Sequence, residues 1–313
     1  MPANYSETPR GVYRFAAVTA VFTVLLLMAG ALVTSNDAAD SVPDWPLAYG
    51  KLIPPLVGGI RFEYTHRVIA ATVAILTFSL ALWLTFSVAR PLAKTLGWTA
   101  LVLVLAQAAL GALRVKEVHP VLSATAHATL AQIFFITVVG LSLYLSPWWQ
   151  KDLPQLEDTG SPSVRSLTLS TTLVILVQLV LGAAFRHGAC GTGQAALVPH
   201  IVGAGVVTAM VVWTGRAAKS RFRENPDIRR GVVLLHSFFG LQILLGFAAW
   251  WAVAIAARDM VQPTLVYVIL TVAHVLGGAL TLASSVLLML SCFRLTRIAG
   301  PVALRRETSR AGV

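Results

Sequence analysis

The sequence predicts an all-α integral membrane protein with eight transmembrane helices, arranged as two tandem four-helix bundles. Hydrophobic residues make up 57% of the 313-residue chain and charged residues only 12%, far below the roughly 25% charged content of soluble domains. Apolar stretches long enough to cross a hydrocarbon core of roughly 30 Å occur at residues 15–33, 68–88, 96–113, 121–145, 167–185, 197–215, 231–254 and 264–292. Motifs in the first four stretches recur in the last four.

The basic residues predict the orientation of the chain in the membrane. The formal net charge is +11, and with a cytoplasmic N-terminus the inner segments carry 17 of the 24 Lys and Arg residues. The other seven fall in outer segments: Lys51, Arg61, Arg67, Arg114, Lys116, Arg186 and Arg258. This bias follows the positive-inside rule, so we expect a multi-pass protein of the cell (plasma) membrane with both termini in the cytoplasm. Topology and contact with anionic membrane lipid then explain the positive charge, and no nucleic-acid partner is expected.

The helices of the first half have recognisable boundaries. The first stretch is about as long as a full span and has no clear small-residue cleavage site, so it predicts a helix and no cleavable signal. It ends at Gly30-Ala-Leu-Val-Thr34, and an outer loop follows that contains Pro43-Asp44-Trp45-Pro46-Leu47. The prolines and the Trp predict a rigid cover at the interface. The second helix opens with Glu63-Tyr64-Thr65-His66-Arg67, the third follows Arg90-Pro91, and the fourth follows His119-Pro120.

Residues 146–165 are the best candidate for a boundary between the halves. They contain Pro, Gly, Ser and charges of both signs, which is typical of a linker. The predicted units are an N-terminal half at 1–150, a cytoplasmic linker at 151–165 and a C-terminal half at 166–313. In the second half the fifth stretch ends at Arg186, the sixth opens with Pro199-His200, the seventh contains Gln242, and the eighth carries His274.

The two halves look like copies of one unit. Gln-x-x-Leu-Gly occurs at 107–111, 178–182 and 242–246, and Gly30 occupies the fourth corresponding place. His66 and His200 are 134 residues apart, and His127 and His274 are 147 apart. Because a four-helix unit keeps its orientation when duplicated, we expect the halves to be related by a pseudo-twofold axis along the membrane normal. The glycines by themselves indicate only close helix packing.

Four histidines are the candidate ligands. His66, His127, His200 and His274 all lie toward the outer ends of even-numbered helices, two in each half. Facing helices of a bundle are where side chains hold cofactors, and two imidazoles approaching from opposite sides suit haem iron. Zinc or copper sites usually include thiolates or carboxylates at closer spacing. A proton relay also suits paired histidines, but it does not explain equal depth in both halves.

Charged residues near these histidines are the next candidates. Glu63 lies three residues before His66 and so shares its helix face, whereas Leu197 takes that place before His200. An acid in only one half suggests one catalytic haem and one electron-transfer haem, and a favourable helix-dipole interaction of Glu63 is compatible with this. The cations at the outer helix ends, Arg67, Arg114 and Arg186, could bind haem propionates or extend to the interface without a partner.

The remaining histidines and the cysteines give weaker signals. His119 and His187 fall in outer turns, where we expect them to be solvated, and His236 is expected to be packed or hydrogen-bonded. Cys190 lies in an outer loop and Cys292 near the inner end of the last helix. The membrane separates the two thiols, so they are not expected to form a disulfide.

With these residues identified, the chain resembles the heme A synthase family. The resemblance rests on Glu63-Tyr-Thr-His66-Arg67, on Pro43-Asp-Trp-Pro-Leu47, on the end of the first helix at Thr34 and on the duplicated layout. It implies oxidation of the C8 methyl group of heme O to the formyl group of heme A. It also implies that His66 and His127 hold the substrate haem, that His200 and His274 hold haem b, and that Glu63 is catalytic. The implied partners are a heme O synthase upstream and an aa3-type terminal oxidase as recipient.

The sequence departs from that family in its cysteines. Many members have a cysteine pair in the first outer loop, where this chain has Val42 and Ala48, and a second pair is reduced to Cys190. The electron acceptor is therefore left open. Two other functions fit the composition and the histidines: a non-catalytic di-haem cytochrome that exchanges electrons with quinone, and a carrier that delivers haem unchanged.

Overall fold

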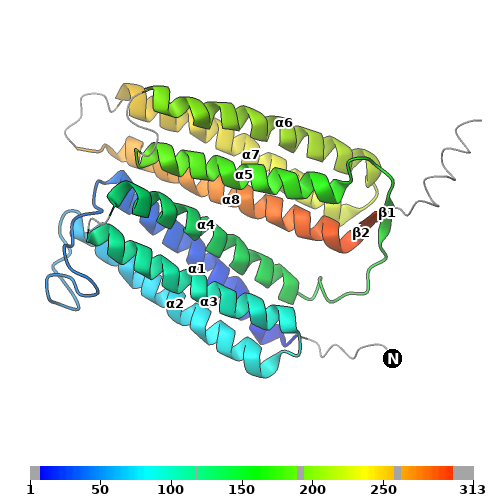
Figure 1. Cartoon of the computed structure of the whole chain (residues 1–313), viewed down its shortest axis with the longest axis horizontal. Helices are drawn as coiled ribbons and strands as arrows, with labels where there is room; N and C mark the ends of the chain where they lie inside the picture. Colours follow the sequence, from blue (N-terminus) through cyan, green and yellow to red (C-terminus); the bar gives the residue numbers. More distant parts are fainter. Residues whose placement is uncertain (1–7, 117–118, 189–193, 257–261, 299–313) are drawn as a thin grey trace, which may run out of the picture.

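The computed structural model describes residues 8–116, 119–188, 194–256 and 262–298, and within them the eight predicted helices are confirmed. Figure 1 shows two bundles side by side, one made of α1 to α4 and the other of α5 to α8. The helices are α1 (Arg10–Ser35), α2 (Ile60–Ser87), α3 (Pro91–Val115), α4 (Pro120–Leu145), α5 (Val164–Arg186), α6 (Val198–Arg221), α7 (Pro226–Trp251) and α8 (Leu265–Leu295). Two helical extensions accompany them, η1 (Gln194–Leu197) before α6 and the π-helical η2 (Ala252–Ala256) after α7.

Local sequence explains where several helices begin. A proline occupies the first turn of α3, α4, α6 and α7, where its missing N–H costs no hydrogen bond. Polar side chains cap the starts of α5, α7 and α8: Ser163 accepts from Ser166 N at 3.2 Å, Asn225 accepts from Ile228 N at 3.0 Å, and Thr264 accepts from Tyr267 N at 3.3 Å. Each cap satisfies an amide that has no partner inside its helix.

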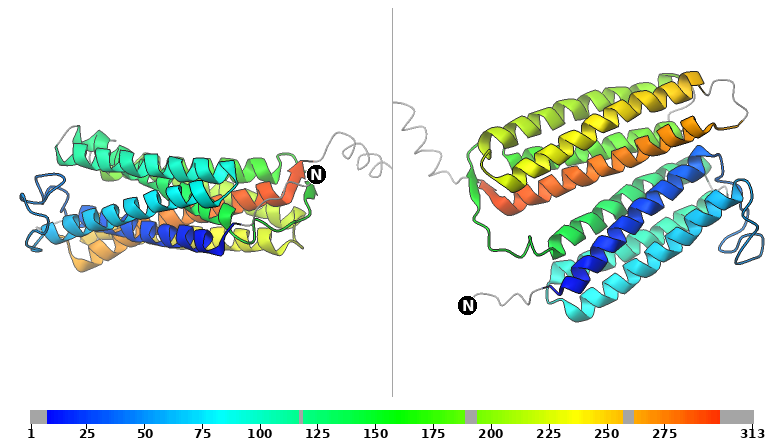
Figure 2. Two further views of the ribbon diagram at one scale, coloured as in Figure 1. Left: turned by 90° about the horizontal axis from the view of Figure 1, so that it is seen from below. Right: turned by 180° about the vertical axis from the view of Figure 1, so that it is seen from behind.

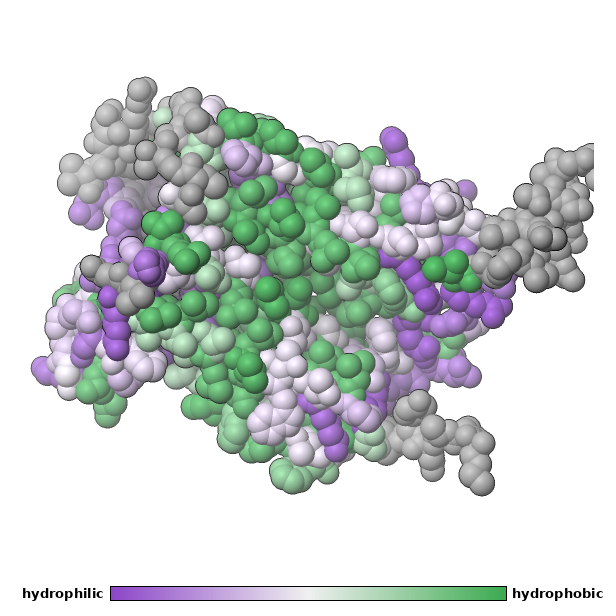
Figure 3. Space-filling view, viewed as in Figure 1, coloured by the Kyte–Doolittle hydropathy of each residue, from purple (hydrophilic) through white to green (hydrophobic). Residues whose placement is uncertain are grey.

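The surface has the polarity of a membrane protein. Figure 3 shows a hydrophobic band across the middle and hydrophilic residues toward both ends. Half-exposed tryptophans mark two levels: Trp83, Trp98 and Trp213 toward the end that carries the N-terminus, and Trp45, Trp250 and Trp251 toward the other end. Such aromatic belts are typical of the two membrane–water interfaces. The chain is therefore a multi-pass membrane protein.

The two bundles pack through α1 and α4 of the first half against α5 and α8 of the second. Phe135 of α4 is buried with Ala279 and Ala283 of α8, and the small side chains on α8 allow this close approach. Toward the outer ends Ser35 of α1 lies 2.9 Å from the hydroxyl of Thr271. A pseudo-twofold relation between the halves stays a prediction.

Two short strands were not expected from the sequence. Strand β1 (Leu156–Asp158) pairs in parallel with β2 (Thr296–Ile298), at the end of the molecule where α8 ends (Figure 2). The carboxylate of Asp158 is buried and accepts from Val164 N at 2.5 Å and from Arg221 Nη1 at 3.3 Å. The stretch expected to be a linker, 151–165, therefore contains a strand and the first two residues of α5.

Candidate functional site

Each candidate histidine packs against a glycine of the preceding helix. A Cβ atom on the glycine would lie 3.2 Å from the ring carbon Cε1 at the pair Gly30–His66, 3.7 Å at Gly111–His127, 2.9 Å at Gly182–His200 and 3.2 Å at Gly246–His274. The helices concerned are α1 with α2, α3 with α4, α5 with α6 and α7 with α8. The repeated glycine therefore provides space for an imidazole, which is more specific than the close helix packing expected from the sequence.

The histidines meet in two pairs. The ring centroids of His66 and His127 are 6.5 Å apart, and those of His200 and His274 are 6.2 Å apart. With a metal–nitrogen bond of about 2.0–2.1 Å and about 1.2 Å from nitrogen to ring centre, two axial imidazoles on one metal lie roughly 6.4 Å apart. A direct T-shaped contact has a similar spacing, but the recurrence in both halves favours a ligand shared by each pair. The residues present therefore fit haem.

Glutamines support three of the four histidines. Gln107 donates to the backbone carbonyl of His127 at 3.0 Å and Gln178 to that of His200 at 2.8 Å. The Nε2 atoms of Gln178 and Gln242 also lie 3.1 Å from Nδ1 of His200 and His274. These contacts hold the rings of His200 and His274 in place, so Gln-x-x-Leu-Gly in the second half combines support for the imidazole with space for it.

The donor set differs from that of a zinc or copper site. In the described parts of the chain no three His, Cys, Asp or Glu side chains gather so that they could hold a metal ion. His66 with His127, and His200 with His274, would hold a haem through their imidazoles, as the sequence predicts.

Glu63 and Arg67 join α2 to the first outer loop. The carboxylate of Glu63 is buried, receives Nη2 of Arg67 at 2.6 Å and accepts from Val42 N at 2.9 Å. Arg67 also donates to the carbonyls of Asp44 at 2.7 Å and Leu47 at 3.0 Å. The motifs at 43–47 and 63–67 therefore form one unit, in which the loop is fastened to the helix turn next to His66.

Asp44 closes the loop itself. Its carboxylate accepts from Gly50 N at 2.8 Å and from Tyr49 N at 2.6 Å. The hydrogen bond from Gly50 is the largest influence on Asp44, and it lowers the pKa of this exposed carboxyl. A carboxylate that stays ionised keeps both hydrogen bonds at neutral pH, so the loop is ordered by its own residues as well as by Arg67.

Of the other two candidate arginines, Arg186 lies between the two halves and Arg114 lies beside the first outer loop. Arg186, at the end of α5, donates to Ser35 Oγ of α1 at 2.8 Å. Arg114 forms an ion pair with the exposed Asp40 at 2.9 Å. Neither Arg114 nor Arg186 is bound to as many acceptors as Arg67, and their role toward haem propionates stays a prediction.

The expectation that His187 is solvated was wrong. The ring is half-buried, and burial is the main reason that its pKa falls to about 4, with further lowering from Arg186 and Arg114. His187 belongs to the same group of outer-end residues as His127, whose charge also contributes to the shift. His119 is exposed, as expected.

This shift predicts acid sensitivity. In the unfolded chain His187 binds a proton as the pH falls below 6.5, whereas in the folded protein it binds one only near pH 4. The folding stability therefore decreases as the pH falls between these two values. Replacing His187 by Gln should reduce the loss of Tm between pH 7.5 and pH 5, measured in detergent. His119→Asn is the control, because Asn tolerates the positive φ found there. An equal loss of Tm in His187→Gln and in the unaltered protein would contradict the prediction.

The structure also describes the surroundings of His236 and Cys292. His236 was expected to be packed or hydrogen-bonded, and it is both: its Nδ1 lies 2.8 Å from the carbonyl of Val232 and its ring lies against Gly215. Cys292 is a buried free thiol, and Cys190 lies outside the described residues.

Fold and site together define the class: an eight-span membrane protein with two paired-imidazole sites suited to haem. Residues 60–196 match the model of the COX15-CtaA family, described as cytochrome oxidase assembly protein. Similar curated proteins named heme A synthase include those of Symbiobacterium thermophilum, 27% identical over 74% of this chain and 83% of its own length, and of an Exiguobacterium species, 27% identical over 55% and 57%. The match to the protein of Alkalihalophilus pseudofirmus is 31% identical and covers 31% of this chain and 34% of that protein.

The chain is thus similar to heme A synthases, and the match to the family model covers less than half of it. The family model includes His66 and His127 and ends before His200, so the second pair is supported by its geometry alone. Several of these matches span less than two thirds of the relatives' own length.

Proposed function

We propose that this protein is a heme A synthase, an oxidoreductase that converts the C8 methyl group of heme O to a formyl group by successive hydroxylations and loss of water. One observation carries the proposal: two imidazole pairs have nearly equal centroid separations, 6.5 and 6.2 Å, and only one pair has an acid one helical turn away. Equal sites with unequal surroundings suit a substrate haem in one half and a redox haem in the other.

In this proposal the histidine pairs of the two halves hold different haems. His66 and His127 hold the substrate heme O, and His200 and His274 hold haem b. Haem b, when bound, supplies one-electron redox chemistry. Gly30 and Gly111 let the first pair of rings approach the substrate, and Gln178 and Gln242 fix the rings of the second pair.

Glu63 is the proposed catalytic residue. It lies three residues before His66, about one helical turn away, and its carboxylate could stabilise a cationic intermediate or take up protons. Its bonds to Arg67 and Val42 fix its position. The propionates of the substrate are proposed to bind Arg114 and Arg186, which make fewer hydrogen bonds to described residues than Arg67 does.

The proposed setting follows from the chemistry of the substrate. A heme O synthase would supply the substrate, and an aa3-type terminal oxidase would receive the product. We propose the plasma membrane as the location, with both termini cytoplasmic and the haem sites toward the outer face, in line with the distribution of Lys and Arg.

The test is expression of the whole protein with a heme O synthase, followed by extraction of the haem and identification by chromatography and mass. We expect heme A or its hydroxylated precursor with the unaltered chain, and loss of both with Glu63→Gln. That variant keeps an oxygen for Val42 N but loses the charge that faces Arg67. Recovery of only haem b and heme O from the unaltered protein would refute the proposal and favour a cytochrome or a carrier.

A second variant separates chemistry from loop attachment. Arg67→Lys keeps a cation beside Glu63 but cannot donate to all the loop carbonyls. If Glu63 acts on the substrate, Arg67→Lys should retain product while Glu63→Gln loses it with the haem absorption intact. Equal loss in both variants would show that Glu63 acts only by holding the loop.

A further inference from the structure

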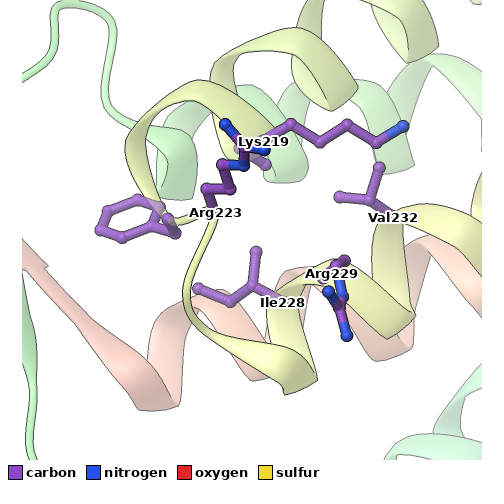
Figure 4. A pocket seen from close by; sticks show the side chains of 7 residues that line it. Lys219, Arg223, Ile228, Arg229 and Val232 are labelled. Carbon is purple, nitrogen blue, oxygen red and sulfur yellow. The ribbon is translucent and has the colours of Figure 1, made fainter.

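A basic notch opens between α6 and α7, at the end of the molecule opposite to the candidate haem sites. It has a volume of about 230 Å³. Figure 4 shows Lys219 on α6, Arg223 in the turn after α6 and Arg229 on α7 around the opening. The floor is apolar and consists of the buried side chains Phe222, Ile228 and Val232.

The three cations of this notch have no acidic partner. In the described ranges none of Lys219, Arg223 and Arg229 forms a hydrogen bond or an ion pair through its side chain. The nearest acids are engaged or turned elsewhere: Asp227 pairs with Arg230 at 3.7 Å and accepts from Trp148 Nε1 at 3.0 Å, and Glu224 pairs with none of the three. The notch therefore concentrates positive charge that no part of the described chain neutralises.

The notch lies at the level of the lipid headgroups in the membrane. Trp213, which belongs to the aromatic belt at this end, lies six residues before Lys219 on α6, or about 9 Å along the helix axis. Because belt tryptophans lie at the level of the membrane interface, the cations lie just beyond it, on the side of the phosphates.

The notch also offers a surface for acyl chains. One turn toward the membrane centre the ring of His236 fills the space at Gly215 and closes the gap between α6 and α7. The exposed Val212 lies seven residues before Lys219 and the exposed Val233 four residues after Arg229, so they extend the same helix faces into the hydrocarbon region.

From these features we propose that the notch binds an anionic phospholipid, with the phosphodiester among Lys219, Arg223 and Arg229 and the acyl chains along Val212 and Val233. Anionic lipids bind basic pockets between transmembrane helices in this way. Three cations exceed the charge of a single phosphodiester, which favours a lipid with two phosphates. The lipid would join the inner ends of α6 and α7, and this proposal is independent of the catalytic function.

The test uses the full-length protein, delipidated in mild detergent, and native mass spectrometry with diphosphatidylglycerol. We expect one retained lipid in the unaltered protein and at least about tenfold weaker retention in Lys219→Gln/Arg223→Gln/Arg229→Gln. The matched control is Arg10→Gln/Arg14→Gln/Lys151→Gln, which removes the same charge at the same end of the molecule and should bind like the unaltered protein. The lipid should also raise the Tm of the unaltered and control proteins, but not of the notch variant.

Three results would overturn the proposal. The first is equal weakening in both triple variants, which would show a diffuse electrostatic attraction. The second is equal retention of phosphatidylcholine, and the third is displacement by millimolar inorganic phosphate, which would show an anion site that does not need acyl chains. If the triple variant does not fold, the single variants Lys219→Gln, Arg223→Gln and Arg229→Gln should each weaken retention several-fold, and no weakening in any of them would equally overturn it.

Discussion

Replacing Gly182 by Ala should remove most of the haem from the second half. The added Cβ would lie 2.9 Å from Cε1 of His200, a contact that forces the ring to move. The ring cannot move freely, because Gln178 binds both its Nδ1 atom and its backbone carbonyl. Overpacking of this kind costs about 1–3 kcal/mol, and we expect roughly five- to hundredfold weaker haem retention. Haem content per protein and the absorption bands of the purified variant measure it.

Gly111→Ala is the matched control. Its Cβ would lie 3.7 Å from His127 Cε1, which is ordinary contact, so haem content should stay within a factor of two or so of the unaltered value. Ala favours a helix over Gly by up to about 1 kcal/mol at both positions, so a loss specific to Gly182→Ala would come from the ring. Equal haem content in the two variants would contradict the glycine–imidazole packing as the reason for the repeated motif.

Replacing Arg67 by Ala should detach the first outer loop. The change leaves the buried carboxylate of Glu63 without its cation and the carbonyls of Val42, Asp44 and Leu47 without a donor. Breaking a buried ion pair costs about 3–5 kcal/mol, and we expect the lower end because Arg67 is 17% exposed. The Tm should fall by roughly 5–10 °C, and trypsin should cleave faster at Lys51 in the loop.

The comparison is Arg114→Ala, which removes an arginine at the same end of the molecule. Its partner Asp40 is 62% exposed, and such surface pairs contribute about 0–1 kcal/mol. We expect a Tm within about 2 °C of the unaltered value and unchanged cleavage at Lys51. A similar fall in both variants would mean that Arg67 contributes only general charge at this surface.

The helices and the histidine pairs could be predicted from the sequence because each has a strong local or repeated signal. A transmembrane helix needs about 20 apolar residues in a row, and eight stretches meet that requirement. His66 and His127 lie on separate helices of a four-helix unit, and the copy of this unit repeats them as His200 and His274. The duplication thus placed each pair at one depth before any coordinates were known.

The features that the sequence did not predict depend on contacts between distant segments. Arg67 reaches carbonyls 20 to 25 residues earlier in the chain, and no pattern indicates which cation of an outer end will face a loop. The low pKa of His187 depends on its burial and on the charges of Arg186 and Arg114, which belong to different halves. The strands β1 and β2 are three residues long and 140 positions apart, too short to show an alternating pattern.

Contacts between chain segments at the end of the molecule where α1 begins bear on how the two halves are connected. In the second half, β1 and β2 bring the residues before α5 against those after α8. In the first half, Thr8 before α1 donates to Gln150 Oε1 after α4 at 2.8 Å. Each half is therefore a closed loop of chain whose entry and exit meet.

A break in the peptide after Gln150 would thus open neither loop. The two pieces would each keep the contact that joins their ends, and their association would rest on the packed faces of α1 and α4 against α5 and α8. Because the ends of each half already meet, two copies of such a unit could be joined end to end without a change in the path of either chain.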